Sequence, residues 1–322
     1  MRSFSFLAPR SLDEALRLLG PEARPLAGGT DLVTLMKADL AAPARLVGIR
    51  ALLPATLVEE AEGVTLGAGM TLAAIEADPI VKHRYAALAQ AAALSATAQL
   101  RNAATLGGNL LQRPRCWYFR NPRVPCWLKG GEHCPAREGE NRQHALFGAG
   151  PCVAVHPSDP AAALLAFDAF ARLAGPRGAR SVALGELMAA PDQSRRRETQ
   201  LADDELVLGL YLPSHPAETR SVYLKAMDRG AFAFSLAGVA AVLRLSPSRR
   251  VGHARVVLSG VAPIPWRAYA AERVLLGAEA GDELFERASR AALEGAAPLR
   301  LNGWKIPLAR ALVKRALQQL AT

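Results

Sequence analysis

The sequence lacks any long apolar run. No stretch of its 322 residues offers the roughly 18 uninterrupted apolar residues that a membrane-spanning helix needs. The N-terminal segment is also too polar for a secretory signal, because Pro9, Arg10, Asp13 and Glu14 interrupt it. We therefore expect no membrane span, and the chain itself shows no export signal.

Charged residues are sparse, at 21% of the chain against 51% hydrophobic residues, and the mean hydropathy is +0.10. This balance is typical of a soluble globular protein, and the length suggests two or three modest domains. Acidic residues are fewer than basic ones, which leaves a net charge of +10. The basic residues are scattered, and their densest run, 194–197, lies in a polar segment. We expect no nucleic-acid binding; docking to an acidic partner subunit is the alternative use.

Cysteine is rare. The chain has four, all between residues 116 and 152, and such crowding predicts one shared site. The spacing contains no close C-x2-C pair of the kind that zinc fingers and ribbons use. Four separated thiolates suit a [4Fe-4S] cluster, while a structural zinc site with His133 and two disulfides stay open as alternatives. The candidate metal ligands are Cys116, Cys126, Cys134 and Cys152.

Basic side chains accompany these cysteines. Arg115, Arg120 and Arg123 are expected to favour thiolates and to offset the charge of a cluster. Residues 113–150 show no regular period, and an irregular loop of this length inside a compact domain is usually functional. Hydrogen bonding or packing is expected of the nearby histidines, His133, His144 and His156.

Common nucleotide-binding and hydrolytic motifs are absent as well. The chain has no G-x-G-x-x-G or Walker sequence, and no Ser/His/Asp or paired-carboxylate arrangement stands out. Two Gly-Gly loops are present instead, "PLAGGTDL" at residues 25–32 and "TLGGN" at residues 105–109. Glycine pairs expose backbone amides that bind anions. Together the loops predict a diphosphate site, although either alone is equally compatible with a plain β-turn.

The pattern of apolar residues predicts an α+β protein. A short edge strand in residues 3–9 precedes an amphipathic helix that Ser11 and Glu14 cap. Residues 203–213 alternate like a strand. From about residue 217 we expect antiparallel strands flanking a helix, followed by amphipathic helices.

Taken in order, these segments resemble a known family. Isolated charges at Asp159, in "HPSDP", and Lys225, in "YLKAMDR", are by default surface salt bridges. Together with the two Gly-Gly loops that precede them in the chain, however, these residues form a pattern that resembles the FAD-binding medium subunits of molybdenum hydroxylases. This family includes xanthine dehydrogenase, carbon monoxide dehydrogenase and aldehyde oxidoreductases. The resemblance covers nearly the whole chain. The matching segments are "LAGGTDL", "RNAATLGGNLLQ", "HPSD", "DDELVLGLYLP", "YLKAMDRGAFAFSLAGVAA" and "SGVAPIPWRAYAAE".

The resemblance implies a two-part FAD-binding domain of the p-cresol methylhydroxylase type (PCMH-type) over residues 1–216, with a Cys-rich insertion at about 113–152. A small α+β domain of the CO dehydrogenase flavoprotein type, an antiparallel sheet with helices, is implied for residues 217–322. Lys225 would stabilise reduced flavin and Asp159 would anchor polar flavin atoms. No catalytic residue beyond bound FAD is expected. The implied FAD-binding residues are Leu26, Ala27, Gly28, Gly29, Thr30, Asp31, Leu32, Thr105, Leu106, Gly107, Gly108, Asn109, Asp159, Val207 and Lys225.

The cysteine segment looks like that of the family subset with an extra [4Fe-4S] cluster, found in hydroxybenzoyl-CoA reductase and in bacterial periplasmic aldehyde oxidoreductases. All four cysteines match this insertion. The implied function is electron transfer. A large molybdenum-cofactor subunit and a small subunit with two [2Fe-2S] clusters would be the partners, and FAD would pass their electrons to an external acceptor.

An aldehyde-oxidising complex is favoured, and a hydroxybenzoyl-CoA reductase-like or xanthine dehydrogenase-like complex is the alternative. Two other classes of protein are alternatives to a subunit of such a complex. A self-contained flavin oxidase would need a substrate domain, for which the residues after Pro216 are few. A zinc-stabilised, non-catalytic binding module would be colourless. The expected location is the cytoplasm, or the periplasm if a signal-bearing partner carries the folded complex.

Overall fold

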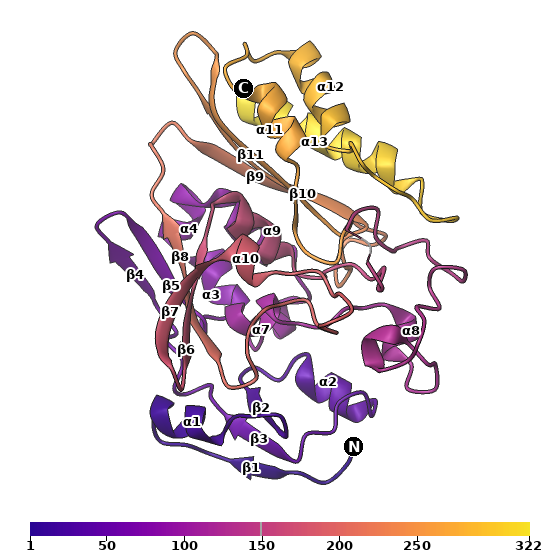
Figure 1. The fold of residues 1–322 in the computed structure, drawn as a ribbon. Coiled ribbons are helices and arrows are strands. Elements are labelled where there is room, and N and C mark those ends of the chain that lie inside the picture. Colours follow the sequence, from indigo (N-terminus) through magenta and orange to yellow (C-terminus); the bar gives the residue numbers. More distant parts are fainter. Residues whose placement is uncertain (149) are drawn as a thin grey trace.

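The computed structural model describes residues 1–148 and 150–322 as three β-sheets that follow one another along the molecule (Figure 1). The N-terminal sheet is parallel, with its strands in the order β1 (Ser5–Leu7), β3 (Arg45–Gly48) and β2 (Ala23–Leu26). Helices α1 (Leu12–Leu18) and α2 (Leu32–Lys37) connect these strands. The predicted edge strand and its helix are confirmed, and Ser11 Oγ accepts the amide of Glu14 at 3.2 Å.

A five-stranded antiparallel sheet forms the middle of the molecule. Its order is β4 (Leu57–Glu60), β5 (Gly63–Gly67), β8 (Leu206–Pro213), β6 (Phe170–Gly175) and β7 (Gly178–Ala183). The strand predicted at residues 203–213 is therefore confirmed as β8. The helices of this part are α3 (Leu72–Ala77), α4 (Pro79–Arg84), α5 (Ala86–Ala93), α6 (Ala98–Arg101), α7 (Leu106–Leu110), α9 (Asp159–Ala166) and α10 (Leu184–Leu187).

The C-terminal sheet is antiparallel, in the order β12 (Trp266–Arg267), β11 (Val251–Ser259), β10 (Ala237–Leu245) and β9 (Arg220–Ala226). Residues 214–219 connect it to β8, and the predicted domain boundary after Pro216 falls in this connection. The helices that follow are α11 (Tyr269–Leu275), α12 (Asp282–Ala291) and α13 (Lys305–Ala321).

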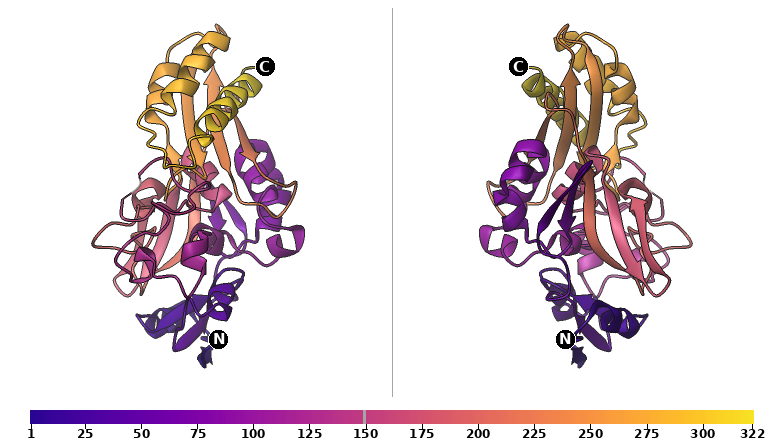
Figure 2. Two further views of the ribbon diagram at one scale, coloured as in Figure 1. Left: turned by 90° about the vertical axis from the view of Figure 1, so that its right-hand side faces the viewer. Right: turned by 90° about the vertical axis from the view of Figure 1, so that its left-hand side faces the viewer.

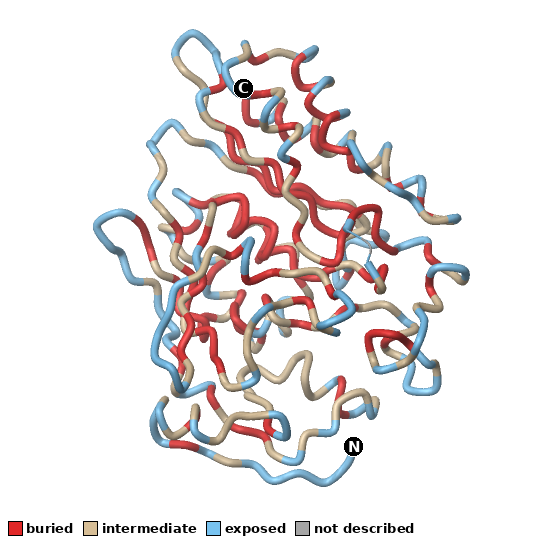
Figure 3. The backbone as a smooth tube through the Cα atoms, in the orientation of Figure 1, coloured by how far each residue is buried: buried red, intermediate tan, exposed pale blue. Residues whose placement is uncertain are grey.

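The helix predicted between these strands is wrong, because β9, β10 and β11 succeed one another directly. Strand β10 is buried on both faces: Ala240 and Val242 pack into the core with α5 and α9, whereas Val239 and Ala241 pack with α13 (Figures 2 and 3). A strand covered on both sides carries a continuous apolar run, which periodicity does not distinguish from a buried helix.

Residues 113–150 are mostly irregular in their described part, as predicted for the cysteine segment. They contain only the short helix α8 (Trp117–Arg120) and one 3-10 turn, Trp127–Lys129, in the described part of the segment. Leu35 of α2 packs in one apolar cluster with Phe119, Cys126 and Cys152. The cysteine segment is thus folded against the helix that follows the first Gly-Gly loop. No helix in residues 1–148 and 150–322 combines the length and the apolarity of a membrane span.

Candidate functional site

Both Gly-Gly loops line one pocket of about 690 Å³ between the N-terminal and the central sheet. Val207 of β8 lines it as well. The structure therefore brings together most of the residues predicted to bind one ligand. Those at the pocket wall are Leu26, Ala27, Gly28, Gly29, Thr30, Asp31, Leu32, Thr105, Gly107, Gly108 and Val207.

The first loop joins β2 to α2 and presents free backbone amides. No acceptor within the described residues takes the amides of Gly28, Gly29 and Thr30. Gly29 has a φ of +71°, and a Cβ at Gly28 would lie 2.1 Å from the carbonyl oxygen of Ala103. Only glycine fits at Gly28 because the loop packs directly on the backbone that leads into the second loop. Consecutive free amides are the feature by which a backbone nest binds an anion, which is the chemistry that the sequence predicts for this loop.

The second loop differs from the first, which corrects the expectation that it repeats the same chemistry. It opens α7, with Thr105 as the N-cap residue. Its amides are already used inside the protein, so they are not available to an anion. Gly107 and Gly108 instead give a ligand close access to the backbone. The donor–acceptor pairs are Leu106 N to Met70 O at 2.8 Å, Gly107 N to Ala68 O at 3.0 Å and Gly108 N to Thr105 Oγ1 at 3.2 Å.

Two residues predicted in the second loop do not reach the pocket. Leu106 is fully buried in the central core. Asn109 Oδ1 accepts a hydrogen bond from Ser158 Oγ at 2.6 Å, which ties α7 to the start of α9. Both residues fix the second loop through contacts on the side away from the pocket.

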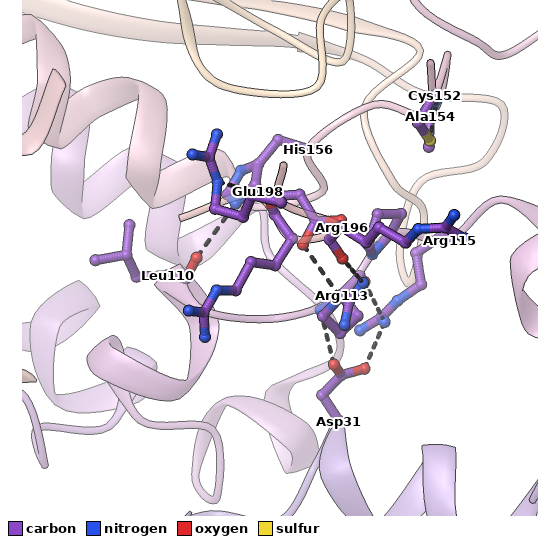
Figure 4. A network of polar contacts seen from close by, with 12 residues as sticks. Asp31, Leu110, Arg113, Arg115, Cys152, Ala154, His156, Arg196 and Glu198 are labelled. Atoms are coloured by element: carbon purple, nitrogen blue, oxygen red, sulfur yellow. Dashed lines mark hydrogen bonds and ion pairs between the residues drawn. The ribbon is translucent and has the colours of Figure 1, made fainter. Parts of the chain in front are cut away.

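Asp31 lines the pocket, but its carboxylate faces the cysteine segment (Figure 4). It accepts hydrogen bonds from Arg115 Nη1 at 2.5 Å, Arg120 Nη2 at 2.8 Å and the backbone amide of Arg113 at 2.8 Å. Arg115 and Arg120 were expected to stabilise the cysteine thiolates. They bind a carboxylate of the first loop instead.

Two unpartnered polar atoms lie at the pocket, and the sequence interpretation missed both of them as ligand contacts. They are His156 Nδ1 and Glu198 Oε1. Arg113 and Glu198 also approach each other, with Nε 3.1 Å from Oε2. Buried groups in proteins are normally hydrogen-bonded, so these atoms indicate a polar ligand. Sequence offered no signal, because Glu198 is 85 positions from Arg113 in the chain.

His156 is neutral at the pocket wall. Burial lowers its pKa to about 4. Its Nε2 donates to Leu110 O at 3.2 Å (Figure 4), which leaves Nδ1 as a free acceptor. Burial raises the pKa of Glu198, against the opposing effect of the Arg113 guanidinium. The pocket thus offers free amide donors on one side and polar side-chain atoms on the other, a set that fits a large polar cofactor such as a dinucleotide.

Asp159 and Lys225 are not at the pocket wall in the described structure. Lys225 Nζ lies 2.7 Å from Asp159 Oδ2, and both side chains are almost fully buried, at 1% and 4% exposed. Tyr223 donates its hydroxyl to Asp159 Oδ1 at 2.6 Å. Burial raises the pKa of Asp159, while the ammonium of Lys225 opposes the shift. The default expectation of a surface salt bridge is wrong, because the pair joins α9 to β9 in the interior.

The four cysteines lie near enough to shift one another's pKa values, and no disulfide joins them. The pKa of Cys134 is lowered to about 6 by a hydrogen bond from Cys152, whose own pKa rises. Burial raises the pKa of Cys116 to about 11, and both Cys126 and Cys134 lie near enough to raise it further. The thiols are therefore mutual neighbours although up to 36 positions separate them in the sequence.

The surroundings of the thiols differ from the prediction. Lys129 favours the thiolate of Cys126, and Arg137 favours that of Cys134. His144 Nε2 lies 3.2 Å from Cys116 Sγ. His133, the additional zinc ligand considered above, has a side chain that is 91% exposed.

A single tetrahedral ion requires sulfur ligands at about 2.3 Å from one centre. No group of three or more His, Cys, Asp or Glu side chains in the described part of the chain is arranged to hold such an ion. A four-iron cluster instead takes one thiolate on each of four irons, so its ligands lie farther apart. Four free, neighbouring thiols are the donor set that such a cluster uses.

The comparisons with known proteins agree with this architecture. A family model described as the FAD binding domain in molybdopterin dehydrogenase matches residues 2–215, and one described as the CO dehydrogenase flavoprotein C-terminal domain matches residues 222–320. The chain is 37% identical over 305 residues to the aldehyde oxidoreductase FAD-binding subunit PaoB of Escherichia coli (strain K12), covering 93% of this chain and 92% of that protein. It is 30% identical over 328 residues to the carbon monoxide dehydrogenase medium chain of Hydrogenophaga pseudoflava, covering 98% and 96%.

Solved structures show the same fold. A carbon monoxide dehydrogenase from Hydrogenophaga pseudoflava that lacks the Mo-pyranopterin moiety matches with a TM-score of 0.78 at 29% identity, over 98% of this chain and 96% of that one. Quinoline 2-oxidoreductase from Pseudomonas putida 86 matches with a TM-score of 0.75 at 25% identity, over 99% and 97%. The predicted fold class is confirmed. The chain belongs to the family of FAD-binding medium subunits of molybdopterin dehydrogenases, and is thus a subunit of an oxidoreductase complex.

Proposed function

We propose that this chain is the FAD- and [4Fe-4S]-binding electron-transfer subunit of a molybdenum-containing aldehyde oxidoreductase. The observation that carries the proposal is the position of four free, neighbouring thiols in a segment that packs against the pocket of the two Gly-Gly loops. The similarity to the PaoB subunit, named for aldehyde oxidation, supports the choice of substrate class.

Within the pocket, the free amides of Gly28, Gly29 and Thr30 would bind the diphosphate of FAD. Gly108 would let the cofactor approach the backbone of α7, because a Cβ there would meet only Thr105 Oγ1. His156 Nδ1 would accept a hydrogen bond from a polar cofactor atom. Bound FAD would supply the redox chemistry, taking electrons from the [2Fe-2S] clusters of a partner and giving them to an external acceptor.

In the cysteine segment, the four thiolates would each hold one iron. Lys129 and Arg137 lie where they favour the thiolate forms of Cys126 and Cys134. His144, beside Cys116, would donate a hydrogen bond to the ligating sulfur. These side chains would hold the ligands in place and offset their negative charge.

The assembly would resemble that of the relatives, whose names mark them as FAD-binding or medium subunits of larger complexes. A large molybdenum-cofactor subunit and a small [2Fe-2S] subunit are the proposed partners. The complex would work in the cytoplasm, or in the periplasm if a partner carries the export signal.

The proposal is tested on the purified full chain after anaerobic reconstitution with iron and sulfide. We expect about one FAD and about four irons per chain, flavin absorption bands, and a broad iron–sulfur shoulder that dithionite bleaches. Cys126→Ser is expected to lower the iron content and leave the flavin bands in place. His133→Ala is the matched control, because this exposed side chain lies in the same segment and is not a proposed ligand.

A colourless protein with about one zinc per chain would instead support the zinc-stabilised module and overturn the proposal. Unchanged iron content in Cys126→Ser would remove Cys126 from the ligand set. Aldehyde oxidation is measured on the complex reassembled with its partners. Activity with a purine or an aryl-CoA thioester instead of aldehydes would assign the chain to one of the alternative complexes.

A further inference from the structure

We infer that Asp31 is a positioning residue that couples FAD binding to the folding of the cysteine segment. The inference rests on the proposed function, since it concerns the FAD pocket and the cysteine segment together. The Asp31 junction consists of the carboxylate of Asp31 with Arg113, Arg115 and Arg120. Figure 4 labels Asp31, Arg113 and Arg115.

Both oxygens of the Asp31 carboxylate accept hydrogen bonds from the cysteine segment. Asp31 precedes α2 directly, where an aspartate commonly caps the helix, yet its side chain makes no capping hydrogen bond. Oδ1 accepts from Arg115 and Arg120, and Oδ2 accepts the backbone amide of Arg113. The side chain is only 14% exposed. Charge-assisted bonds at a partly buried site are stronger than neutral ones, so the contacts fix the loop and the segment relative to each other.

The two guanidinium groups brace the start of the cysteine segment. Arg120 ends α8, the helix that begins just after Cys116, and donates to Pro114 O at 2.8 Å and Arg113 O at 2.9 Å. Arg115 also donates to Arg113 O, at 2.9 Å. The backbone of residues 113–115 is therefore held between the first loop and α8.

A further contact extends the junction to the second loop. Arg115 Nη2 donates to Gln112 Oε1 at 2.9 Å, and Gln112 Nε2 donates to Asn109 O at 2.9 Å. Asn109 belongs to α7, which carries Gly107 and Gly108. Both loops of the FAD pocket are thus connected to the cysteine segment by side chains that meet at Asp31.

The positions of Arg115 and Arg120 distinguish an indirect effect on FAD binding from direct contact with the ligand. Asp31 lines the pocket, whereas neither Arg115 nor Arg120 does. An effect of either arginine on FAD affinity must therefore pass through the junction. Because coupling between two sites is reciprocal, bound FAD is also expected to slow the loss of iron from the cysteine segment.

The experiment measures the FAD dissociation constant of the full chain by flavin fluorescence. Asp31→Asn, Arg115→Gln and Arg120→Gln are each expected to weaken FAD binding by about tenfold. The double variant Asp31→Asn/Arg115→Gln is expected to bind no more weakly than either single variant, because the two residues act through one interaction. Arg115→Lys keeps the charge and is expected to restore part of the affinity. Arg123→Gln is the matched control: its side chain is exposed, it belongs to the same segment, and it makes no contact with Asp31 among the described hydrogen bonds.

The reciprocal arm follows the rate at which a chelator removes iron, with and without saturating FAD. Wild type is expected to lose iron several-fold more slowly with FAD, and Asp31→Asn is expected to lose this difference. A variant that only unfolds would release iron at the same fast rate in both conditions and would show a lower Tm, so thermal unfolding is measured in parallel. Arg120→Lys replaces Arg120→Gln if the latter does not fold.

Wild-type affinity in both Arg115→Gln and Arg120→Gln would overturn the inference. Weak binding in Asp31→Asn alone would show that Asp31 acts on FAD directly and would overturn it as well. A wild-type chain that binds no FAD would overturn the proposed function. The two failures are therefore distinguishable.

Discussion

Lys225 and Asp159 form a buried ion pair, with Nζ 2.7 Å from Oδ2 and both side chains at most 4% exposed. Lys225 also donates to the carbonyl oxygens of Leu94, at 2.9 Å, and Ala233, at 2.8 Å. The pair joins α9 of the central part to β9 of the C-terminal sheet. It therefore fixes the FAD-binding part against the C-terminal part.

Lys225→Met is expected to lower the free energy of unfolding by about 3–5 kcal/mol, because it leaves the buried carboxylate of Asp159 without its cation. The double variant Asp159→Asn/Lys225→Met is expected to recover part of this loss. Urea denaturation measures both. The control is Arg84→Gln, which breaks the exposed Arg84–Glu59 pair and is expected to cost less than about 1 kcal/mol. If Lys225→Met shifted the flavin potential without lowering stability, the direct flavin role implied by the resemblance would be right.

The sequence located both loops but did not predict how their amides are used. The Gly-Gly pattern predicts exposed amides at Gly28 and Gly29, and no acceptor within the described residues takes these two amides. The same pattern fails in the second loop, because Leu106 N and Gly107 N donate to the carbonyls of Met70 and Ala68 in a distant segment, and Gly108 N donates to Thr105 Oγ1. Hydrogen bonds between residues nearly 40 positions apart depend on tertiary packing, which a local motif does not encode.

Long-range pairing also explains the other differences. The arginines beside the cysteines predicted thiolate stabilisation, yet Arg115 and Arg120 bind Asp31, more than 80 positions away. The isolated charges at Asp159 and Lys225 form their ion pair only when α9 packs near β9. Motif spacing identifies which residue types are available, whereas the fold decides which partners they meet.

Gly28→Ala is expected to disturb the pocket more than Gly108→Ala. A Cβ at Gly28 would lie 2.1 Å from the carbonyl oxygen of Ala103, whereas one at Gly108 would meet only the hydroxyl of Thr105, at 2.9 Å. Forcing the backbones apart costs about 1–3 kcal/mol, so Gly28→Ala is expected to lower the Tm and the FAD content. Gly108→Ala is expected to keep the Tm and to weaken FAD binding by occupying pocket space.

The control for the glycine variants is Gly230→Ala, since a Cβ there would meet no atom within 4 Å. It is expected to leave the Tm and the FAD content unchanged. Differential scanning fluorimetry and flavin absorbance measure the two quantities. An unchanged Tm in Gly28→Ala would contradict the close packing of the two loops.

His156→Leu is expected to weaken FAD binding by about fivefold, the effect of losing one hydrogen bond of about 1 kcal/mol. The unpartnered Nδ1 at the pocket wall would be lost, and Leu110 O would lose its donor. His156→Gln keeps a donor and an acceptor and is expected to bind FAD nearly as wild type does. His133→Gln, at an exposed position, is the control. Equal affinities in wild type and His156→Leu would show that Nδ1 does not contact the cofactor.

Lys305 is expected to make the stability of the chain rise with pH. Its ammonium is fully buried and donates to the carbonyl oxygens of Gln143, at 3.2 Å, of His144, at 3.0 Å, and of Gly260. Burial lowers its pKa to about 7 from an ordinary value of 10.5. Between these two values the unfolded chain binds a proton that the folded chain does not. The free energy of unfolding therefore increases as pH rises from about 7 to 10.5, by at most about 1.4 kcal/mol per pH unit from this group.

Lys305→Met is expected to remove this contribution to the slope, and to lower stability at pH 9 because the buried carbonyl oxygens around the amine lose their donor. Urea unfolding at several pH values between 7 and 10 measures both effects. The control is Lys82→Met, at an exposed position of α4, which is expected to keep the wild-type slope. The same slope in wild type and Lys305→Met would show that Lys305 stays protonated in the folded chain. Lys305 would then be a permanent cation, and its ammonium would hold the cysteine segment through the carbonyl oxygens of residues 143 and 144.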